Sequence, residues 1–262
     1  MRVYRIKGRN GKKIKMILST VTNALPFNTN NPTAWSQLPG ALIQVSVSGD
    51  RMCGVNAGNE IWCAPTTSDT KQWGFWGYQS KTWFKKQGLL KHISIYGQNA
   101  CGVNSADQIW CADNIDNPEW VRIPGALKQI DLNGMKMCGV NSADQIFCAT
   151  YMQGNWAQKT GALKHISIDG AHACGANSND DIYCTENIDI ASPAWNQVQG
   201  KLKNIDIKGS AMCGTNSADN IWCASFNQEN WLQLPGALKY LSIDGTNIVG
   251  ANSANNIYIS PM

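Results

Sequence analysis

One short pattern, Gly-x-Asn-x4-Ile, recurs six times in the chain, and in four copies a carboxylate follows three residues after the asparagine. Amide and carboxylate groups in fixed positions can hydrogen-bond the hydroxyl groups of a sugar when an aromatic ring stacks on its apolar face. The chain supplies 11 tryptophans for that second role. The polar candidates for carbohydrate binding are Asn56, Asn104, Asn141, Asn177, Asn216, Asn252, Asp107, Asp144, Asp180 and Asp219.

The same residues have a purely structural alternative. Asparagine and aspartate often cap tight turns through their own side chains. Nothing in the pattern chooses between a cap and a ligand contact. The tryptophans that open each copy are expected to pack between repeats, and a ligand contact at such a junction is left open.

Composition limits the other classes of function. Charged residues make up 15% of the chain, while 27 asparagines and 11 tryptophans suit uncharged polar ligands. Seven basic residues lie within residues 1–15, which leaves 15 basic against 18 acidic residues in the rest, so no surface for nucleic acid is expected. No apolar run approaches the roughly 18 residues of a membrane span.

Catalytic groups are scarce. Of three histidines, His92 and His165 occupy the repeat position filled by Gln44 and Gln129 in other copies, so they are interpreted as part of a polar wall. No nucleophile–base triad is visible, and we predict a protein that is not an enzyme and has no cofactor or metal. Residues 113–119 group oxygen ligands that could bind calcium, but a solvated turn is preferred because they lack the order of an EF-hand loop.

A longer repeat contains the Gly-x-Asn pattern. Each of six copies runs Trp-x4-Gly-x-Leu, an alternating stretch, then Cys-Gly-x-Asn-x4-Ile-aromatic-Cys, and only the last copy lacks the cysteines. The copies start 36 to 48 residues apart, which is typical of units that bury their faces against neighbours. Turn residues recur every eight to twelve positions, so each unit has room for short strands and none for a helix. The anchors are Trp35, Trp83, Trp120, Trp156, Trp195 and Trp231.

The pairing inside each hairpin can be derived from one copy. If Cys101 faces Cys111, then Gly102 faces Trp110, and a three-residue loop ends at Asp107. The last loop position needs a left-handed conformation, which aspartate and asparagine tolerate. The register also places an aromatic residue opposite the glycine of every hairpin, where its ring can cover the bare backbone.

That register predicts five disulfide bonds. Zinc is a poorer explanation, because the cysteines lie on two strands without clustered histidines, and reduced buried thiols are the remaining alternative. In the sixth copy an apolar pair, Val249 and Ile259, takes the cysteine positions. Disulfides at this density point to an oxidising compartment. The predicted bonds are Cys53–Cys63, Cys101–Cys111, Cys138–Cys148, Cys174–Cys184 and Cys213–Cys223.

Two stretches resemble a known repeat. Gly-Val-Asn-Ser-Ala-Asp-Gln-Ile-Trp (102–110) and Leu-Pro-Gly-Ala-Leu-Lys (234–239) are similar to the tectonin repeat of tachylectin-1, the fish egg lectins and the slime-mould and fungal tectonins. The resemblance covers residues 35–260. It implies an all-β, six-bladed β-propeller and a non-enzymatic lectin that binds sugars such as N-acetylglucosamine, methylated saccharides or lipopolysaccharide.

Such a propeller needs four antiparallel strands in each blade. In the third copy these are expected at 127–132, 137–141, 145–149 and 156–159. The last copy ends after its third strand, and the chain begins one strand early, so we predict that Trp35–Leu38 completes blade six and closes the ring. In the usual winding, the hairpin loops and the connections from outer to inner strands share one face, which would display the asparagines.

Two segments lie outside the repeat. Residues 65–82 form an insertion rich in rings, whose Trp73 and Trp76 are further candidates for carbohydrate binding. A dimer contact or a cover for a blade edge fits this insertion as well. Residues 1–30 are interpreted as a basic leader, a disordered tail or a start assigned too early, and residues 31–262 as a single propeller domain.

Together these features favour a secreted lectin with several similar sites, which recognises glycans on microbial or egg surfaces as an innate-defence agglutinin does. The alternative is a non-catalytic propeller that binds a protein partner. A homo-oligomer is left open.

Overall fold

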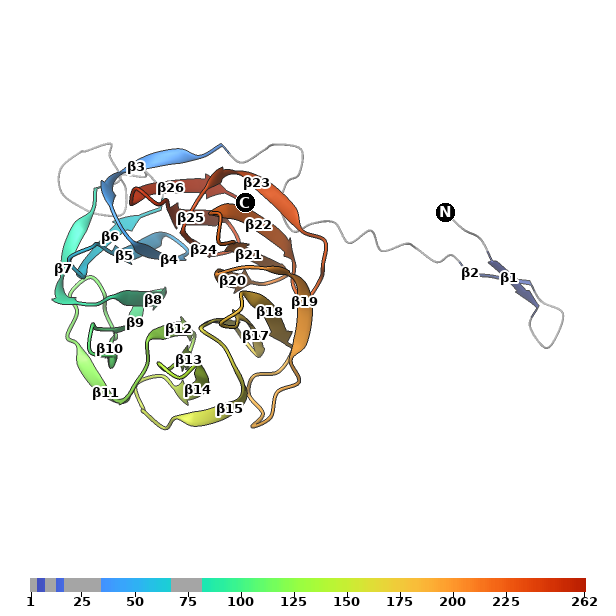
Figure 1. Ribbon diagram of the computed structural model, residues 1–262, viewed down its shortest axis with the longest axis horizontal. Helices are drawn as coiled ribbons and strands as arrows, with labels where there is room; N and C mark the ends of the chain where they lie inside the picture. The colour runs from blue at the N-terminus through green and yellow to red at the C-terminus, as the bar shows by residue number, and fades with distance from the viewer. Residues whose placement is uncertain (1–3, 8–12, 17–33, 67–81) are drawn as a thin grey trace.

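The computed structural model describes residues 4–7, 13–16, 34–66 and 82–262. Six four-stranded sheets form a ring of blades, as Figure 1 shows, and residues of the inner strands line a central channel. A separate antiparallel pair, β1 (Tyr4–Lys7) and β2 (Lys13–Met16), comes before the ring in the chain. The described residues contain no helix that is long and apolar enough to cross a membrane. The predicted all-β, six-bladed propeller is confirmed.

Each blade is an antiparallel sheet whose strands run in order from the channel to the rim. Blade one comprises β4 (Gln44–Ser48), β5 (Arg51–Val55), β6 (Glu60–Pro65) and β7 (Phe84–Leu89). Blade two comprises β8 (His92–Tyr96), β9 (Asn99–Val103), β10 (Gln108–Ala112) and β11 (Val121–Ala126). Blade three comprises β12 (Gln129–Asn133), β13 (Lys136–Val140), β14 (Gln145–Thr150) and β15 (Ala157–Ala162). Blade four comprises β16 (His165–Asp169), β17 (His172–Ala176), β18 (Asp181–Thr185) and β19 (Asn196–Lys201). Blade five comprises β20 (Asn204–Lys208), β21 (Ala211–Thr215), β22 (Asn220–Ser225) and β23 (Leu232–Ala237). Blade six comprises β24 (Tyr240–Ile243), β25 (Asn247–Ala251), β26 (Asn256–Pro261) and β3 (Ser36–Ala41).

The ring closes as predicted. Strand β3 pairs with β26, so that Leu38 faces Ile257. The first and the last strand of the ring in sequence therefore lie side by side in blade six (Figure 1). The outer strands extend further toward their C-terminal ends than the sequence indicated. Their pairing with the neighbouring strand is interrupted by a register shift at the Pro-Gly dipeptide, or at the two residues in its place, and resumes after it. In blade two, for example, Ile109 pairs with Ile123 whereas Gln108 pairs with Ala126.

The predicted hairpin register is confirmed. Cys101 faces Cys111, Gly102 faces Trp110, and Val249 faces Ile259 in the blade without cysteines. The third loop residue has a positive φ in every hairpin: Asn59, Asp107, Asp144, Asp180, Asp219 and Asn255.

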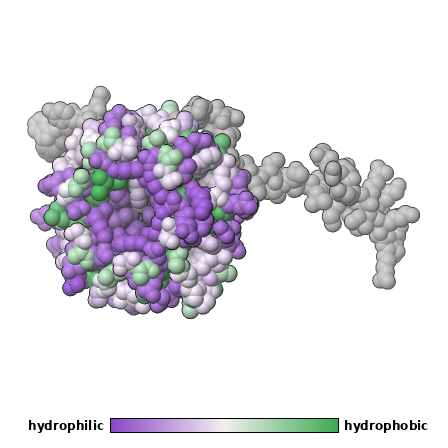
Figure 2. Space-filling view, in the orientation of Figure 1, coloured by the Kyte–Doolittle hydropathy of each residue, from purple (hydrophilic) through white to green (hydrophobic). Residues whose placement is uncertain are grey.

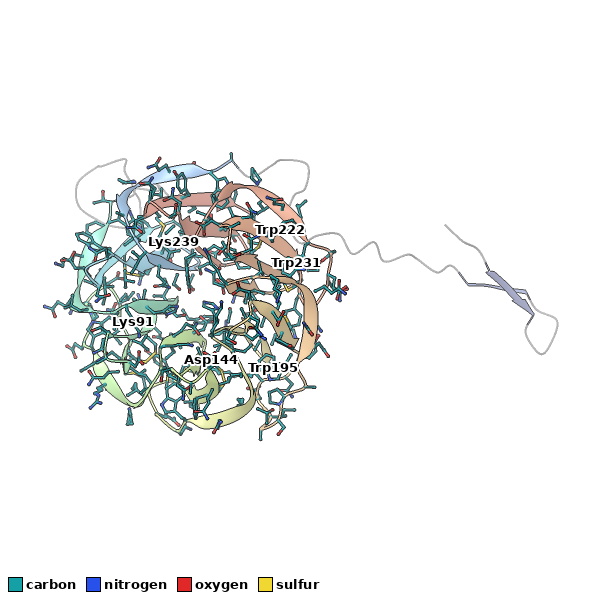
Figure 3. All side chains as sticks on the ribbon, viewed as in Figure 1. Lys91, Asp144, Trp195, Trp222, Trp231 and Lys239 are labelled. Atoms are coloured by element: carbon teal, nitrogen blue, oxygen red, sulfur yellow. A yellow bond between two sulfur atoms is a disulfide. The ribbon has the colours of Figure 1, made fainter. Side chains whose placement is uncertain are left out.

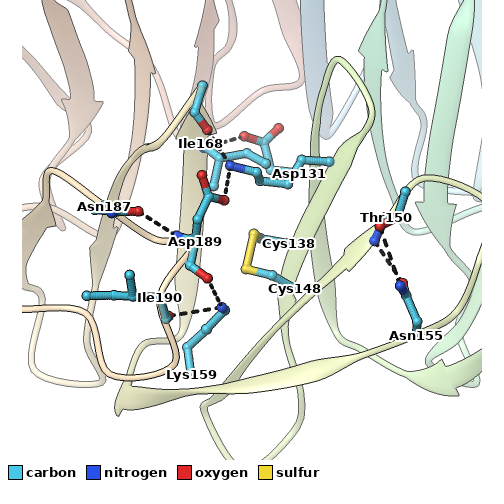
Figure 4. Close-up of a disulfide and its surroundings, with 12 residues drawn as sticks. Asp131, Cys138, Cys148, Thr150, Asn155, Lys159, Ile168, Asn187, Asp189 and Ile190 are labelled. Atoms are coloured by element: carbon cyan, nitrogen blue, oxygen red, sulfur yellow. Dashed lines mark hydrogen bonds and ion pairs between the residues drawn. A yellow bond between two sulfur atoms is a disulfide. The ribbon is translucent and has the colours of Figure 1, made fainter.

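All ten cysteines form the five predicted disulfides, each with its two Cα atoms 4.1 Å apart. Figure 4 shows one of them, Cys138–Cys148, which bridges β13 and β14. The bonds are buried within the apolar layers between blades. One such layer joins Ile109 and Ile123 of blade two to Ile130 and Leu132 of blade three. Each blade therefore buries its faces against its neighbours, as a repeat unit must.

The hairpin glycine is required by a backbone carbonyl and a leucine of its own blade rather than by the ring opposite. A Cβ added to Gly139 would lie 2.5 Å from the Gln129 carbonyl oxygen and 2.7 Å from Cδ1 of Leu127. Phe147 faces this glycine in register, but its ring is not among the three nearest atoms. The leucine of Trp-x4-Gly-x-Leu thus packs over the glycine of Cys-Gly-x-Asn in the same blade.

The same leucine links one blade to the previous one. The N–H of Leu127 donates to the carbonyl of Asp107 at 2.9 Å, and the corresponding bond occurs at the other five junctions. Hairpin loops and outer-to-inner connections therefore lie on one face of the ring, as predicted.

Candidate functional site

Small pockets open where neighbouring blades meet. Three share the same walls: the connection that leads into a blade, the asparagine of that blade's hairpin, and two aromatic rings. Their volumes are about 220, 250 and 300 Å³ at the entries to blades two, four and five. The walls include Trp110, Trp120 and Asn104; Tyr183, Trp195 and Asn177; and Trp222, Trp231 and Asn216.

Each pair of rings comes from two places in the blade. Trp222 lies on β22, and Trp231 immediately precedes β23. Both side chains are partly buried, and Figure 3 shows them toward the outer part of the ring, with Trp195 at the next junction. Half-buried rings of this kind leave one surface for a small ligand.

The outer tryptophan is fixed by a hydrogen bond across the junction. The Nε1–H of Trp120 donates to the Gln87 carbonyl at 2.7 Å, and that of Trp231 to the Gln199 carbonyl at 2.6 Å. Because indole has only this donor, its ring offers a ligand apolar surface alone. The bond recurs for Trp35, Trp156 and Trp195.

Trp83 is the exception. Its Nε1 is buried without a hydrogen-bond partner in the part of the chain that the structure describes. Its ring still packs against Gly40, since Cδ1 lies 3.4 Å from where a Cβ on that glycine would be. The junction that closes the ring, between blades six and one, therefore lacks a bond that the other five junctions have.

The six asparagines of the repeat cap their own hairpins. In blade two, Oδ1 of Asn104 accepts the N–H groups of Ala106 and Gln108 at 3.0 and 2.9 Å. The bond to the fourth residue on occurs in all six hairpins. A structural role is therefore established for each asparagine, and the amide Nδ2 is the group that can still contact a ligand.

The loop acids are paired with lysines of their own blades. The four ion pairs are Lys91–Asp107, Lys128–Asp144, Lys164–Asp180 and Lys203–Asp219. In blade six the acid is replaced, and Lys239 donates to Asn255. Figure 3 labels Lys91, Asp144 and Lys239 of this set. None of the four acids lines one of the three pockets described above.

The remaining candidates are the two tryptophans of the insertion and the oxygen-rich stretch at 113–119. Trp73 and Trp76 lie outside the described residues. In the calcium candidate at 113–119, Asp116 pairs with Arg51 at 2.8 Å and with Lys86 at 3.6 Å. Residues 34–66 and 82–262 contain no group of three or more His, Cys, Asp or Glu side chains that could hold a metal ion.

Polar side chains line the central channel, and Figure 2 shows hydrophilic residues around its opening. In one layer, each side chain accepts an N–H from the next blade's inner strand. Asp131 accepts that of Ile168 at 2.7 Å (Figure 4), and Ser242 accepts that of Val47 at 3.1 Å. The layer forms a closed ring of hydrogen bonds through Ser46, Ser94, Asp131, Ser167, Asp206 and Ser242.

Several side chains in the channel have pKa values far from their ordinary ones. Burial, with the charge of Asp206 as a second cause, raises the pKa of Asp131 to about 7, and burial also raises the pKa of Asp206. Burial lowers the pKa of His92 and of His165 to about 3. Both histidines hydrogen-bond the Tyr240 hydroxyl, at 2.9 and 3.1 Å, as part of the predicted polar wall.

Chemically, the junction pockets offer ring faces and amide N–H groups. Sequence reasoning named the asparagines and the tryptophans but did not join them into one site. The signal was present in the hairpin register, which put an aromatic residue on the strand beside each asparagine. Placing the outer tryptophan in the same pocket required the blade-to-blade packing.

Solved structures with similar folds are propellers of low sequence identity. Human WBSCR16 is 7% identical, with a TM-score of 0.56 over 85% of this chain and 76% of that one. YCF48 bound to D1 peptide is 12% identical, with a TM-score of 0.55 over 94% and 100%. Cps50 (Swd1) of Myceliophteria thermophila is 8% identical, with a TM-score of 0.61 over 86% and 99%. These similarities support the fold alone.

The family is shown by sequence. No curated protein matches the chain. The family model of the Tectonin domain matches residues 15–133 and 112–261, which together include every blade. The chain belongs to the tectonin family of β-propeller proteins.

Proposed function

We propose that the protein is a non-catalytic lectin that binds glycans in the pockets between its blades. The observation that carries the proposal is the recurrence of one pocket design, two aromatic rings beside an asparagine, at three junctions. Rings stack on the apolar face of a pyranose, while the amide donates to a hydroxyl group.

Several similar sites suit a polyvalent surface. A weak site that is repeated on one rigid ring gains about 10²- to 10⁴-fold in avidity when several sites engage together. We therefore propose microbial or egg-surface glycans as ligands, with N-acetylglucosamine, methylated sugars and lipopolysaccharide as the first to test. The five disulfides support secretion into an oxidising environment, where an agglutinin of innate defence would act.

The proposal is tested on a glycan array, together with haemagglutination and competition by free sugar. Trp222→Ala should abolish glycan binding in the pocket at the entry to blade five and so lower the avidity of the whole protein on the array. Met135→Ala is the control, because Met135 is exposed and lines none of the three pockets. If the array detects no bound saccharide and the protein does not agglutinate cells, the proposal is overturned.

A second candidate function is the binding of a protein partner. One of the structurally similar propellers holds a peptide, and Phe84, Leu89 and Val121 expose large apolar side chains on the outer strands of blades one and two. A pull-down that retains one protein without sugar competition would favour this candidate.

A further inference from the structure

The three junction pockets are not equivalent. They differ at the residue that follows the glycine of the Gly-x-Leu connection, which is Leu89 in the first pocket, Ala162 in the second and Lys201 in the third. Alanine occupies this position at the other three junctions of the ring. Only the pocket at the entry to blade five therefore has a cation on its wall, and it is also the largest of the three described.

Lys201 lines this pocket, and its ammonium group is bonded to the neighbouring hairpin of blade four. It donates to Oδ1 of Asp181 at 2.6 Å and to the Asn179 carbonyl at 3.0 Å. An ammonium group has three donors, so a third remains for a ligand. The side chain is 61% exposed, and exposed ion pairs hold their partners weakly, so the group can turn toward an anion in the pocket.

A second donor is free at the same place. In blades one to four, Nδ2 of the hairpin asparagine donates to the side chain four residues later, as in Asn177 to Asp181 at 3.2 Å. In blade five the fourth residue is Asn220, and Nδ2 of Asn216 makes no such bond among the described residues. Its Oδ1 is still held by the hairpin, which fixes the orientation of the amide.

We propose that the pocket of blade five takes a saccharide that carries a carboxylate, and that the pockets with Leu89 and Ala162 take neutral sugars. The carboxylate accepts from Lys201 and Asn216, and the apolar face of the sugar lies on Trp222 and Trp231. This inference rests on the proposed lectin function and divides its sites into two classes. A hydrogen bond between charged groups is roughly twice as strong as a neutral one, so one wall residue can decide the class.

The test compares matched neutral and acidic glycans on one array: a glucoside with a glucuronide, lactose with N-acetylneuraminyl-lactose, and oligogalactan with oligogalacturonan. The wild-type protein should bind both classes. Lys201→Ala, which copies the alanine found at four other junctions, should lower binding of the acidic member about tenfold and leave the neutral member unchanged. Lys201→Arg should retain the acidic binding, and that binding should weaken with salt.

Lys85→Ala is the matched control. Lys85 is also an exposed lysine on an outer strand, it pairs with Glu60 at 2.5 Å, and it lines none of the three pockets. This inference alone would be overturned if the protein bound neutral glycans and no acidic ones. It would also be overturned if Lys201→Ala left the binding of acidic glycans intact. Absence of binding to every glycan would overturn the lectin function, and this inference with it.

Discussion

Four titratable groups in the central channel, each at least partly buried, make the stability of the ring depend on pH in two opposite directions. The carboxyl groups of Asp131 and Asp206 have raised pKa values, whereas the imidazoles of His92 and His165 have lowered ones. Burial is the first cause in each case. Asp131 and Asp206 belong to the closed layer of hydrogen bonds around the channel, whereas the two histidines bond the Tyr240 hydroxyl, so pH acts on both sets of contacts.

Asp131→Asn should change the slope of stability between about pH 4 and pH 7. The pKa of Asp131 is about 7 in the folded protein and about 4 in the unfolded chain, so between these values the folded state binds the extra proton. The free energy of unfolding must then fall as pH rises from about 4 through 7, by up to about 1.4 kcal/mol per pH unit, and the slope disappears above the folded pKa. Urea unfolding from pH 5 to 8 should show a steeper fall with rising pH in the wild type than in the variant. Parallel profiles would contradict the prediction.

The two histidines should act on the acid side. Their pKa is about 3 when folded and about 6.5 when unfolded, so below pH 6.5 the unfolded chain binds more protons and stability is lost as pH falls. His92→Gln uses the residue that fills this repeat position in blades one and three, and should make the loss between pH 6.5 and 4.5 shallower. Thermal melts across that range measure it, with His172→Gln as control because His172 is partly exposed.

At the scale of the element, the repeat motif is a set of contacts between fixed backbone positions. Gly139→Ala should cost about 3 kcal/mol, because the new methyl group would meet the Gln129 carbonyl at 2.5 Å and Leu127 at 2.7 Å. Gly134→Ala is the control. Its φ is +58°, but nothing lies within 4 Å of the added Cβ, so the cost should be about 1 kcal/mol. Equal losses in urea unfolding would show that these two contacts do not impose the glycine.

Blade six offers a test of the hairpin register. Val249 and Ile259 are buried and directly opposed, as the cysteines of the other blades are. Val249→Cys combined with Ile259→Cys should form a sixth disulfide in air and raise stability by about 2 to 3 kcal/mol, offset in part by lost apolar packing. Mass spectrometry before and after reduction detects the bond. The single variant Val249→Cys is the control, and a double variant that stays reduced would contradict the shared register.

The sequence predicted these elements because their signals are local. A cysteine pair, a left-handed loop residue and an alternating strand each report on residues within ten positions, so the hairpins and disulfides followed from one copy, whereas the strand order of the blade came from the resemblance to the tectonin repeat. The pockets could not be derived in the same way, because Trp231 reaches Gln199 of the preceding blade. Their geometry depends on how one blade packs on the next, and no pattern within a single copy encodes that packing.

At the scale of the molecule, closure depends on one strand from the far end of the chain. Strand β3 is the only outer strand that does not follow its own hairpin in sequence, and its junction with blade one lacks the tryptophan bond found elsewhere. Deletion of residues 1–40 should therefore lower the melting temperature sharply. A finer test separates the contribution of closure from the loss of chain.

Leu38→Ala and Leu234→Ala form a matched pair for that finer test. The two leucines occupy the same repeat position on β3 and β23, and they are 5% and 6% exposed. If β3 is bound as firmly as an outer strand within its own repeat, both variants should lose a similar amount, about 2 to 5 kcal/mol, in urea unfolding. Hydrogen exchange should then accelerate in β26 for the first variant and in β22 for the second. A Leu38→Ala loss near zero beside a full Leu234→Ala loss would mean that blade six is stable without its fourth strand, and that the ring is not held together at this junction.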